Sequence, residues 1–255
     1  DLEYPMKKLK FTFKNAAGEE LAGLLELPEN PKAFALLAHC FTCGKDLKGA
    51  ARIARKLTEN AIAVLRFDFT GLGNSEGDFS NTNFSSNISD LLCAVDYLRR
   101  QYEAPSLLIG HSLGGSAILS IAGEVPEAKA VVTIGSPGEL THVKRLFKDD
   151  VENINQHGAY PVELAGRVFT LKKQMLDNIQ EHKIAHKVFA MNKPLLIFHA
   201  TEDDTVLIEQ AEKIFKAAKH PKSFISLGKA DHLLTHAQDA EYVADIIISW
   251  SECYL

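Results

Sequence analysis

Short, almost continuous apolar segments recur along this chain, and segments with helical spacing separate them. The clearest are AFALLAHC (33–40), AIAVLRFDF (61–69), SLLIGHS (106–112) and AVVTIGSP (130–137). Runs of this kind are typical of strands buried on both faces, and their alternation with helices is typical of a mostly parallel sheet with helices on both sides. The pattern therefore predicts an α/β fold.

The remaining segments extend this sheet. Residues 7–14 alternate between polar and apolar side chains, and residues 21–29 follow a turn at Gly18, so these two strands are expected to pair as an antiparallel hairpin. Further strands are predicted at 194–200 and 223–228, and helices at 47–60, 85–102, 113–124, 207–218 and up to about Trp250. Eight strands are predicted in total, within one domain.

Residues 138–190 interrupt the alternation of strands and helices. They are more polar, and they contain several short helical patterns and a hairpin candidate, PVELAGRVFTL. Because this segment lacks the composition of a linker, it is expected to form a cap subdomain over one edge of the sheet. The whole chain, residues 1–255, is therefore read as a single domain with an insertion.

Composition limits the classes of partner. The net charge is −5 and acidic and basic residues are mixed along the chain, so nucleic acid is not an expected partner. The apolar runs are too short to span a bilayer, which argues against a membrane protein. Four cysteines in 255 residues do not make a disulfide scaffold and favour a reducing compartment. The sequence leaves the oligomeric state open, a homodimer included.

The N-terminus carries no apolar signal-peptide core. Met6, followed by Lys7 and Lys8, is read as the native start, with residues 1–5 as added residues. We therefore expect a cytoplasmic protein.

The segment LLIGHSLGGSA contains the strongest chemical signal. Gly110, Ser112 and Gly114 form G-x-S-x-G between a predicted strand and a predicted helix, which is the context of a nucleophile elbow. Small flanking residues allow the tight turn, and the N-terminus of the following helix favours developing negative charge. The sequence therefore predicts Ser112 as a nucleophile rather than part of an ordinary Gly/Ser turn.

A serine hydroxyl needs a base that accepts its proton, and that base needs an orienting acid. In folds with this elbow, the acid and then the histidine follow the serine in the chain. His232 follows the strand at 223–228 and is the predicted base, whereas His236, one helical turn later, is expected on the surface. Asp231 is expected to be structural, because adjacent side chains rarely point the same way.

Three acidic residues follow the strand at 194–200. Asp203 is preferred over Asp204 and Glu202, because it lies three residues before Val206 in a D-x-x-V pattern that is familiar at this position. The alternative is that all three acids belong to a solvated turn.

Several segments together resemble the α/β-hydrolase superfamily, and more closely the hydrolase domain that is fused to an OsmC-like domain in some bacterial proteins. They are AHCFTCGKDL, AVLRFDFTGLGNSEGDF, TNFSSNISDL, LIGHSLGGSAIL, TIGSP, AGRVFTLKKQ and KHPKSFISLGKADHLL. The resemblance implies a catalytic triad of Ser112, Asp203 and His232. The chain ends at Leu255 without an OsmC-like segment, so it is read as a standalone relative or an excised domain.

The resemblance also implies an oxyanion hole. In α/β hydrolases the strand before the first long helix commonly ends in His-Gly-x, and this chain has His39-Cys40-Phe41 at that place. The backbone amides of Phe41 and Leu113 are therefore the expected donors. For Cys40 and Cys43, structural thiols are favoured over a redox-sensitive switch, and a metal pair is the least favoured alternative because no further ligands lie nearby.

The stretch FDFTGLGNSEG (67–77) is rich in glycine but lacks the pattern of a phosphate-binding loop. Asp68 is expected to bond to backbone groups there.

These features predict a serine hydrolase that cleaves small-molecule carboxylic esters through an acyl-enzyme, without a metal or another cofactor. The cap is expected to set specificity for short to medium acyl chains, with Phe147, Phe169 and Met175 lining an acyl pocket, although such stripes are more often cap core. Two alternatives remain open. One is cleavage of thioesters or amides by the same triad, and the other is a non-catalytic domain that binds a partner or senses redox state.

Overall fold

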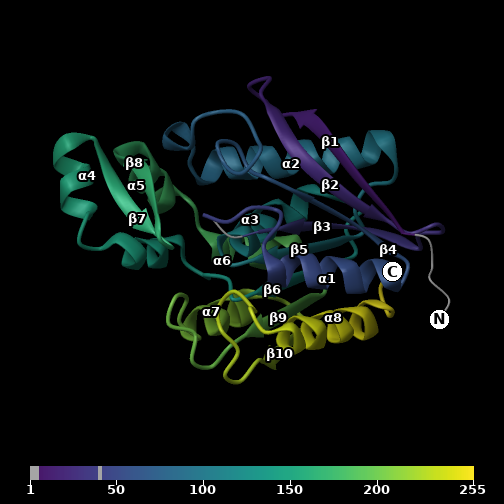
Figure 1. Ribbon diagram of the computed structural model, residues 1–255. Helices are drawn as coiled ribbons and strands as arrows, with labels where there is room; N and C mark the ends of the chain where they lie inside the picture. Colours follow the sequence, from purple (N-terminus) through teal and green to yellow (C-terminus); the bar gives the residue numbers. More distant parts are fainter. Residues whose placement is uncertain (1–5, 40–41) are drawn as a thin grey trace.

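An eight-stranded sheet forms the centre of the protein in the computed structural model, which describes residues 6–39 and 42–255 (Figure 1). The strand order is β1-β2-β4-β3-β5-β6-β9-β10; β2 runs antiparallel to β1 and β4, and the other neighbouring strands are parallel. The strands are β1 (Lys7–Lys14), β2 (Glu20–Leu27), β3 (Ala33–Ala38), β4 (Ile62–Phe67), β5 (Leu107–His111), β6 (Ala130–Ile134), β9 (Leu195–His199) and β10 (Lys222–Ser226). The predicted mostly parallel, eight-stranded sheet is confirmed.

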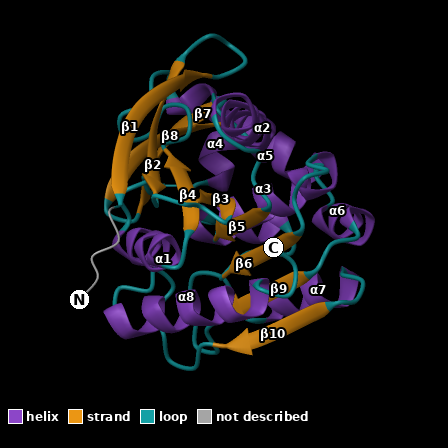
Figure 2. Cartoon of the chain, turned by 90° about the vertical axis from the view of Figure 1, so that its right-hand side faces the viewer, coloured by secondary structure: helices purple, strands orange, loops and turns teal. Residues whose placement is uncertain are grey.

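Helices cover both faces of this sheet (Figure 2). Helices α1 (Lys48–Glu59) and α8 (Ala237–Ser251) pack on one face, and α2 (Phe84–Gln101), α3 (Leu113–Ile121), α6 (Ile184–Met191) and α7 (Glu209–Ala217) pack on the other. Short 3₁₀ turns lie at η1 (Phe79–Asn81) and η2 (Ala122–Glu124). Among the described residues, no helix is long and apolar enough to cross a bilayer.

Successive strand residues supply two separate hydrophobic cores. Leu36 and Leu108 face the core under α2 and α3, whereas Leu37 and Ile109 face the core under α1 and α8. Side chains alternate between the faces of a strand, so a strand with helices on both sides must be apolar at every position. This requirement explains the continuous apolar runs in the sequence.

An insertion lies between β6 and β9 and runs from Leu140 to Met191, whereas the cap was predicted at residues 138–190 (Figure 1). It begins with η3 (Leu140–Phe147), α4 (Val151–His157), a two-stranded sheet of β7 (Ala159–Leu164) and β8 (Arg167–Lys172), and α5 (Lys173–Glu181). Helix α6, which completes the insertion, packs against the main body. Ala165 and Gly166 turn the hairpin with φ angles of 51° and 74°.

Polar contacts attach the cap to the start of α2. The side chain of Asn178 accepts a hydrogen bond from the backbone N–H of Ser85 (3.0 Å) and donates one to its hydroxyl (2.8 Å). Gln174 Nε2 donates to the carbonyl oxygen of Thr82 at 2.9 Å. Side chains of α5 therefore bind backbone groups at the end of a helix in the main body.

Candidate active site

The turn at Ser112 joins the C-terminal end of β5 to the N-terminus of α3. Ser112 has φ 54° and ψ −130°, a backbone conformation that non-glycine residues rarely adopt and that needs support from its surroundings. A β-carbon at Gly114 would lie 2.2 Å from the carbonyl oxygen of His39, and one at Gly110 would lie 2.3 Å from the Cα atom of Gly115. The glycines of the motif are therefore required for close backbone packing around the serine.

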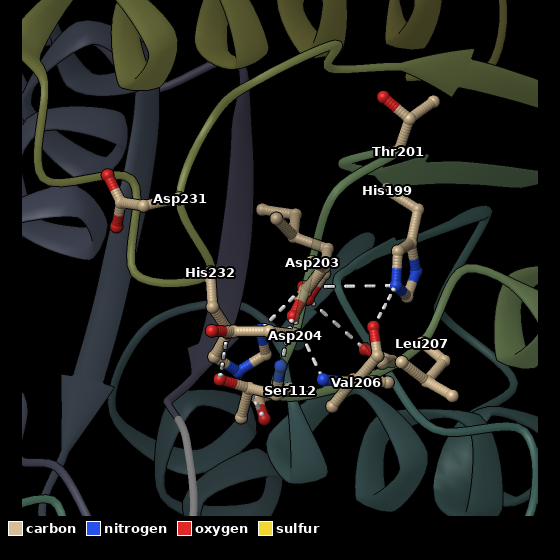
Figure 3. A network of polar contacts seen from close by, with 12 residues as sticks. Ser112, His199, Thr201, Asp203, Asp204, Val206, Leu207, Asp231 and His232 are labelled. Carbon is tan, nitrogen blue, oxygen red and sulfur yellow. Dashed lines mark hydrogen bonds and ion pairs between the residues drawn. The ribbon is translucent and has the colours of Figure 1, made fainter.

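Three predicted side chains meet at this turn (Figure 3). His232 Nε2 lies 3.0 Å from Ser112 Oγ, and His232 Nδ1 lies 2.7 Å from Asp203 Oδ2. Ser112 follows β5, Asp203 follows β9, and His232 follows β10, so all three lie at the carboxyl edge of the parallel strands. The fold thus brings together groups that are 120 and 29 residues apart in the chain.

Burial and hydrogen bonding distinguish Asp203 from its acidic neighbours. Asp203 is buried, whereas Glu202 and Asp204 are exposed. Asp203 Oδ1 accepts hydrogen bonds from the backbone N–H groups of Thr205 (3.0 Å) and Val206 (2.9 Å). The D-x-x-V spacing therefore has a physical reason, since the amide of the valine binds the carboxylate.

The environment of Asp203 favours its charged form. Burial alone would raise the pKa of Asp203, but the hydrogen bond from His232, the charge of that imidazole and the Val206 amide outweigh burial and lower the pKa below its usual value. The carboxylate is therefore available to accept the Nδ1–H of His232.

His199, the last residue of β9, supports the loop that carries Asp203. Its Nε2 lies 2.7 Å from the carbonyl oxygen of Val206 and 3.8 Å from Asp203 Oδ2. His199 is fully buried, and burial lowers its pKa, so the ring is a neutral donor. The sequence reading did not identify His199, because nothing in the local pattern relates a strand residue to a turn seven positions later.

The loop around His232 is shaped by Asp231, as the sequence suggested. Asp231 accepts hydrogen bonds from the backbone N–H groups of Leu233 (2.9 Å) and Thr235 (3.0 Å to Oδ2), and from the Thr235 hydroxyl (2.6 Å). His236 is exposed at the start of α8. Asp231 therefore organises the turn, and neither it nor His236 contacts Ser112.

The structure describes one of the two predicted oxyanion donors. Leu113 is the first residue of α3, so its backbone N–H has no acceptor within the helix and remains available for an anion. Phe41, the other predicted donor, lies outside the described residues.

A buried ion pair anchors the nearby segment that follows residue 41. Asp68 Oδ1 accepts from the backbone N–H of Lys45 (2.7 Å), and Oδ2 accepts from Lys45 Nζ (2.8 Å) and from the Asn74 backbone N–H (3.0 Å). Burial opposes both charges, but the contacts between them prevail: the pKa of Lys45 is raised and that of Asp68 is lowered. Asp68 binds backbone groups as predicted.

A pocket of about 260 Å³ opens next to Ser112 and His232. Its other described lining residues come mainly from the cap and the neighbouring loops: Thr42, Cys43, Leu146, Glu163, Leu164, Ala165, Thr205 and Leu233. The lining is predominantly apolar, and Glu163 is the one acidic residue among these described positions.

Phe147, Phe169 and Met175 do not line this pocket, so their assignment to an acyl site needs correction. All three are buried in the hydrophobic core below and within the cap, and the ring of Phe169 lies 4.8 Å from that of Phe79. Leu146, the residue before Phe147, lines the pocket instead. Apolar spacing identified side chains that pack but did not show which face meets the nucleophile.

The described cysteines differ in oxidation state. Cys43, which lines the pocket, is disulfide-bonded, whereas Cys93 and Cys253 are free. Cys40 lies outside the described residues. The favoured expectation of reduced thiols therefore does not describe Cys43 in this structure.

Comparison with known proteins agrees with this architecture. The family described as "Serine aminopeptidase, S33" matches residues 29–149. The mitochondrial palmitoyl-protein thioesterase ABHD10 of Bos taurus is 26% identical over 151 residues, which cover 56% of this chain and 48% of that protein. The match thus spans about half the length of this curated relative.

Two solved structures extend the similarity to nearly the whole chain. Est1E from Butyrivibrio proteoclasticus, solved with ferulic acid bound, is 21% identical with a TM-score of 0.79, and the match covers 96% of this chain and 98% of Est1E. The esterase domain of a Rhodothermus marinus protein is 45% identical with a TM-score of 0.79, and the match covers 98% of this chain and 99% of that domain. This chain belongs to the α/β-hydrolase superfamily.

Proposed function

We propose that this protein is a serine hydrolase that cleaves carboxylic esters of short to medium acyl chains through an acyl-enzyme. The observation that carries the proposal is the continuous hydrogen-bonded series from Ser112 through His232 to Asp203 beside an apolar pocket. The 45% identity to an esterase domain supports ester chemistry.

In the proposed first step, His232 Nε2 accepts the Ser112 proton while Oγ attacks the ester carbonyl carbon. Asp203 stabilises the resulting imidazolium. The oxyanion accepts a hydrogen bond from the Leu113 N–H, with the second donor expected on sequence grounds at Phe41. His232 then gives its proton to the departing alcohol, and the acyl group remains on Oγ.

In the second step, His232 accepts a proton from water, and the hydroxyl oxygen attacks the acyl carbon. Collapse of the tetrahedral intermediate breaks the bond to Oγ, and His232 returns the proton to Ser112. The carboxylic acid leaves, and both steps proceed with groups of this chain and water.

The pocket supports a limited acyl length. Its volume of about 260 Å³ is slightly smaller than the roughly 300–1,000 Å³ usual for drug-sized ligands. Its apolar lining favours an uncharged hydrocarbon group over a charged one.

Fluorophosphonate labelling tests the nucleophile. Wild-type protein should be labelled and should hydrolyse p-nitrophenyl esters, and Ser112→Ala should lose both properties, with kcat reduced by about 10⁴-fold or more. Ser120→Ala is a matched control, because Ser120 is also buried but its hydroxyl donates to the Ser116 carbonyl oxygen within α3. An unlabelled wild type, or equal labelling of Ser112→Ala, would overturn the proposal.

Thioester or amide cleavage is the second candidate, and the names of the matched thioesterase and aminopeptidase family favour testing it. One acyl group should be compared as its p-nitrophenyl ester, its coenzyme A thioester and its anilide. A higher kcat/KM for the thioester or anilide would replace the ester assignment while keeping the same residues.

A further inference from the structure

His111 makes a second connection between the serine and histidine segments. It is the last residue of β5 and directly precedes Ser112, and its Nε2 atom lies 2.7 Å from the main-chain carbonyl oxygen of His232. The two imidazole rings lie 5.1 Å apart. The residue before the proposed nucleophile therefore binds the main chain of the proposed base, in addition to the side-chain contact between Ser112 and His232.

The chemistry of this contact defines the state of the His111 ring. A carbonyl oxygen only accepts hydrogen bonds, so Nε2 must carry the proton. Burial lowers the pKa of His111 to about 3, with the neighbouring His232 adding to the effect, so the ring is neutral near neutral pH. Nδ1 is then an unprotonated nitrogen.

The other nitrogen shows that this ring is costly to bury. Nδ1 of His111 is buried without a hydrogen-bond partner among the described residues. A small cavity of about 10 Å³ beside the ring is otherwise lined by apolar residues such as Leu37, Ile53 and Ile134. An apolar side chain would fill such a site without an unsatisfied polar atom. What a histidine adds at this position is the hydrogen bond from Nε2.

We infer that His111 is a positioning residue, which fixes the main chain of His232 so that its imidazole stays within hydrogen-bond distance of Ser112. This inference rests on the proposed serine hydrolase function. Ser112 directly follows His111 at the end of β5, so the bond from His111 sets the position of the base relative to the nucleophile directly. His111 itself touches no reacting atom.

Two substitutions separate the hydrogen bond from packing. His111→Leu removes the donor, and His111→Gln keeps an N–H donor at the end of the side chain. We expect His111→Leu to lower kcat for a p-nitrophenyl ester and the rate of fluorophosphonate labelling by about 10²-fold, with little change in KM, because a displaced base affects chemistry more than binding. His111→Gln should recover most of this loss.

Thr133→Val provides the matched control. Thr133 is fully buried on β6, pairs with Gly110 on β5, and has a hydroxyl without a partner among the described residues. This change also replaces a buried polar group beside the elbow but touches no triad loop, so kcat should stay within about twofold of wild type. Circular dichroism and thermal unfolding should establish that each variant is folded.

The outcomes are distinguishable. A folded His111→Leu variant with wild-type kcat, or equal losses in His111→Leu and His111→Gln, would overturn the inference while leaving labelling of wild-type Ser112, and hence the proposed function, intact. If His111→Leu does not fold, ¹⁵N imidazole shifts of the wild type decide: a protonated Nε2 with a bare Nδ1 on His111 supports the bond, and the opposite tautomer rejects it. An unlabelled wild type would instead reject the proposed function.

Discussion

The side chain of Asp203 accepts a hydrogen bond from the backbone N–H of Val206 within one tight turn. The N–H of Val206 donates to Asp203 Oδ1 at 2.9 Å, which leaves Oδ2 facing His232 at 2.7 Å. The Val206 carbonyl accepts from His199 on the other side. The carboxylate is therefore held in one orientation before any substrate arrives.

This orientation leads to the first prediction, for Asp203→Asn. An amide next to His232 Nδ1 favours the wrong imidazole tautomer, so kcat should fall by about 10³–10⁴-fold in ester hydrolysis. Asp204→Asn is the control, because Asp204 is the adjacent acid but is exposed. Similar losses in the two variants, measured by steady-state kinetics, would contradict the assignment of Asp203.

A second prediction concerns the acyl pocket. Leu146 lines the pocket and is 42% exposed, so Leu146→Trp should fill part of the space. We expect kcat/KM for p-nitrophenyl octanoate to fall about 10-fold more than that for p-nitrophenyl acetate, since the longer chain needs the lost volume. Val168→Trp, at a cap residue that is 70% exposed and outside the pocket lining, should leave the ratio unchanged. An unchanged ratio in Leu146→Trp would place the acyl chain elsewhere.

A third prediction tests the packing of the elbow. In Gly114→Ala the new methyl group would lie 2.2 Å from the His39 carbonyl oxygen, so α3 must move away from β3. The free energy of unfolding should decrease by about 1–3 kcal/mol, and activity should fall because Leu113 and Ser112 move with the helix. Urea titration and ester kinetics measure the two effects.

Gly123→Ala is the control for this change. A β-carbon there would lie 3.6 Å from the Cα atom of Met191, which is an ordinary contact. Stability should change by no more than about 1 kcal/mol, because alanine also lowers the entropy of the unfolded chain. A Gly114→Ala variant as stable and active as Gly123→Ala would show that the elbow tolerates displacement.

The fourth prediction is the pH dependence of stability. His111 and His199 have lowered pKa values when folded, chiefly through burial, so the unfolded chain binds more protons as the pH falls. The free energy of unfolding should therefore decrease as the pH falls below 6.5, the ordinary pKa of both groups. For His111 the decrease should continue down to about pH 3, with a slope of up to about 1.4 kcal/mol per pH unit. His111→Gln should flatten this loss.

Asp90 should act in the opposite direction. Burial raises its pKa to about 6, so the folded chain binds the extra proton between about 6 and its ordinary value of 3.8. Falling pH through this window therefore stabilises the fold through Asp90, and Asp90→Asn should steepen the acid-induced loss. Urea titrations at pH 7.5, 6 and 5 measure the slopes, and a flatter slope in Asp90→Asn would refute the expected sign.

The sequence predicted the features that depend on local spacing. All eight strands were placed from apolar runs or from alternation of polar and apolar residues, although β3 and β4 end at Ala38 and Phe67, earlier than the expected 40 and 69. Local polarity does not show where a chain stops pairing with its neighbour. The G-x-S-x-G motif located Ser112 because the turn imposes small residues at fixed positions.

Features that depend on distant contacts were not predictable in this way. The local pattern around His111 showed no role for its side chain, because its partner, the His232 carbonyl, lies 121 residues away. Phe147 was chosen for the pocket while Leu146 lines it, since the one-residue difference depends on how η3 rests on the main body. Tertiary packing decides both cases.

The contacts of Gln174 and Asn178 with Thr82 and Ser85 have a consequence for access to the serine. A cap that moved away would remove the partners of main-chain groups in the first turn of α2 and just before it, and water would have to replace each partner. We therefore expect the entrance to the pocket to keep a constant width, so that substrates are selected by their shape and not by opening and closing of the cap.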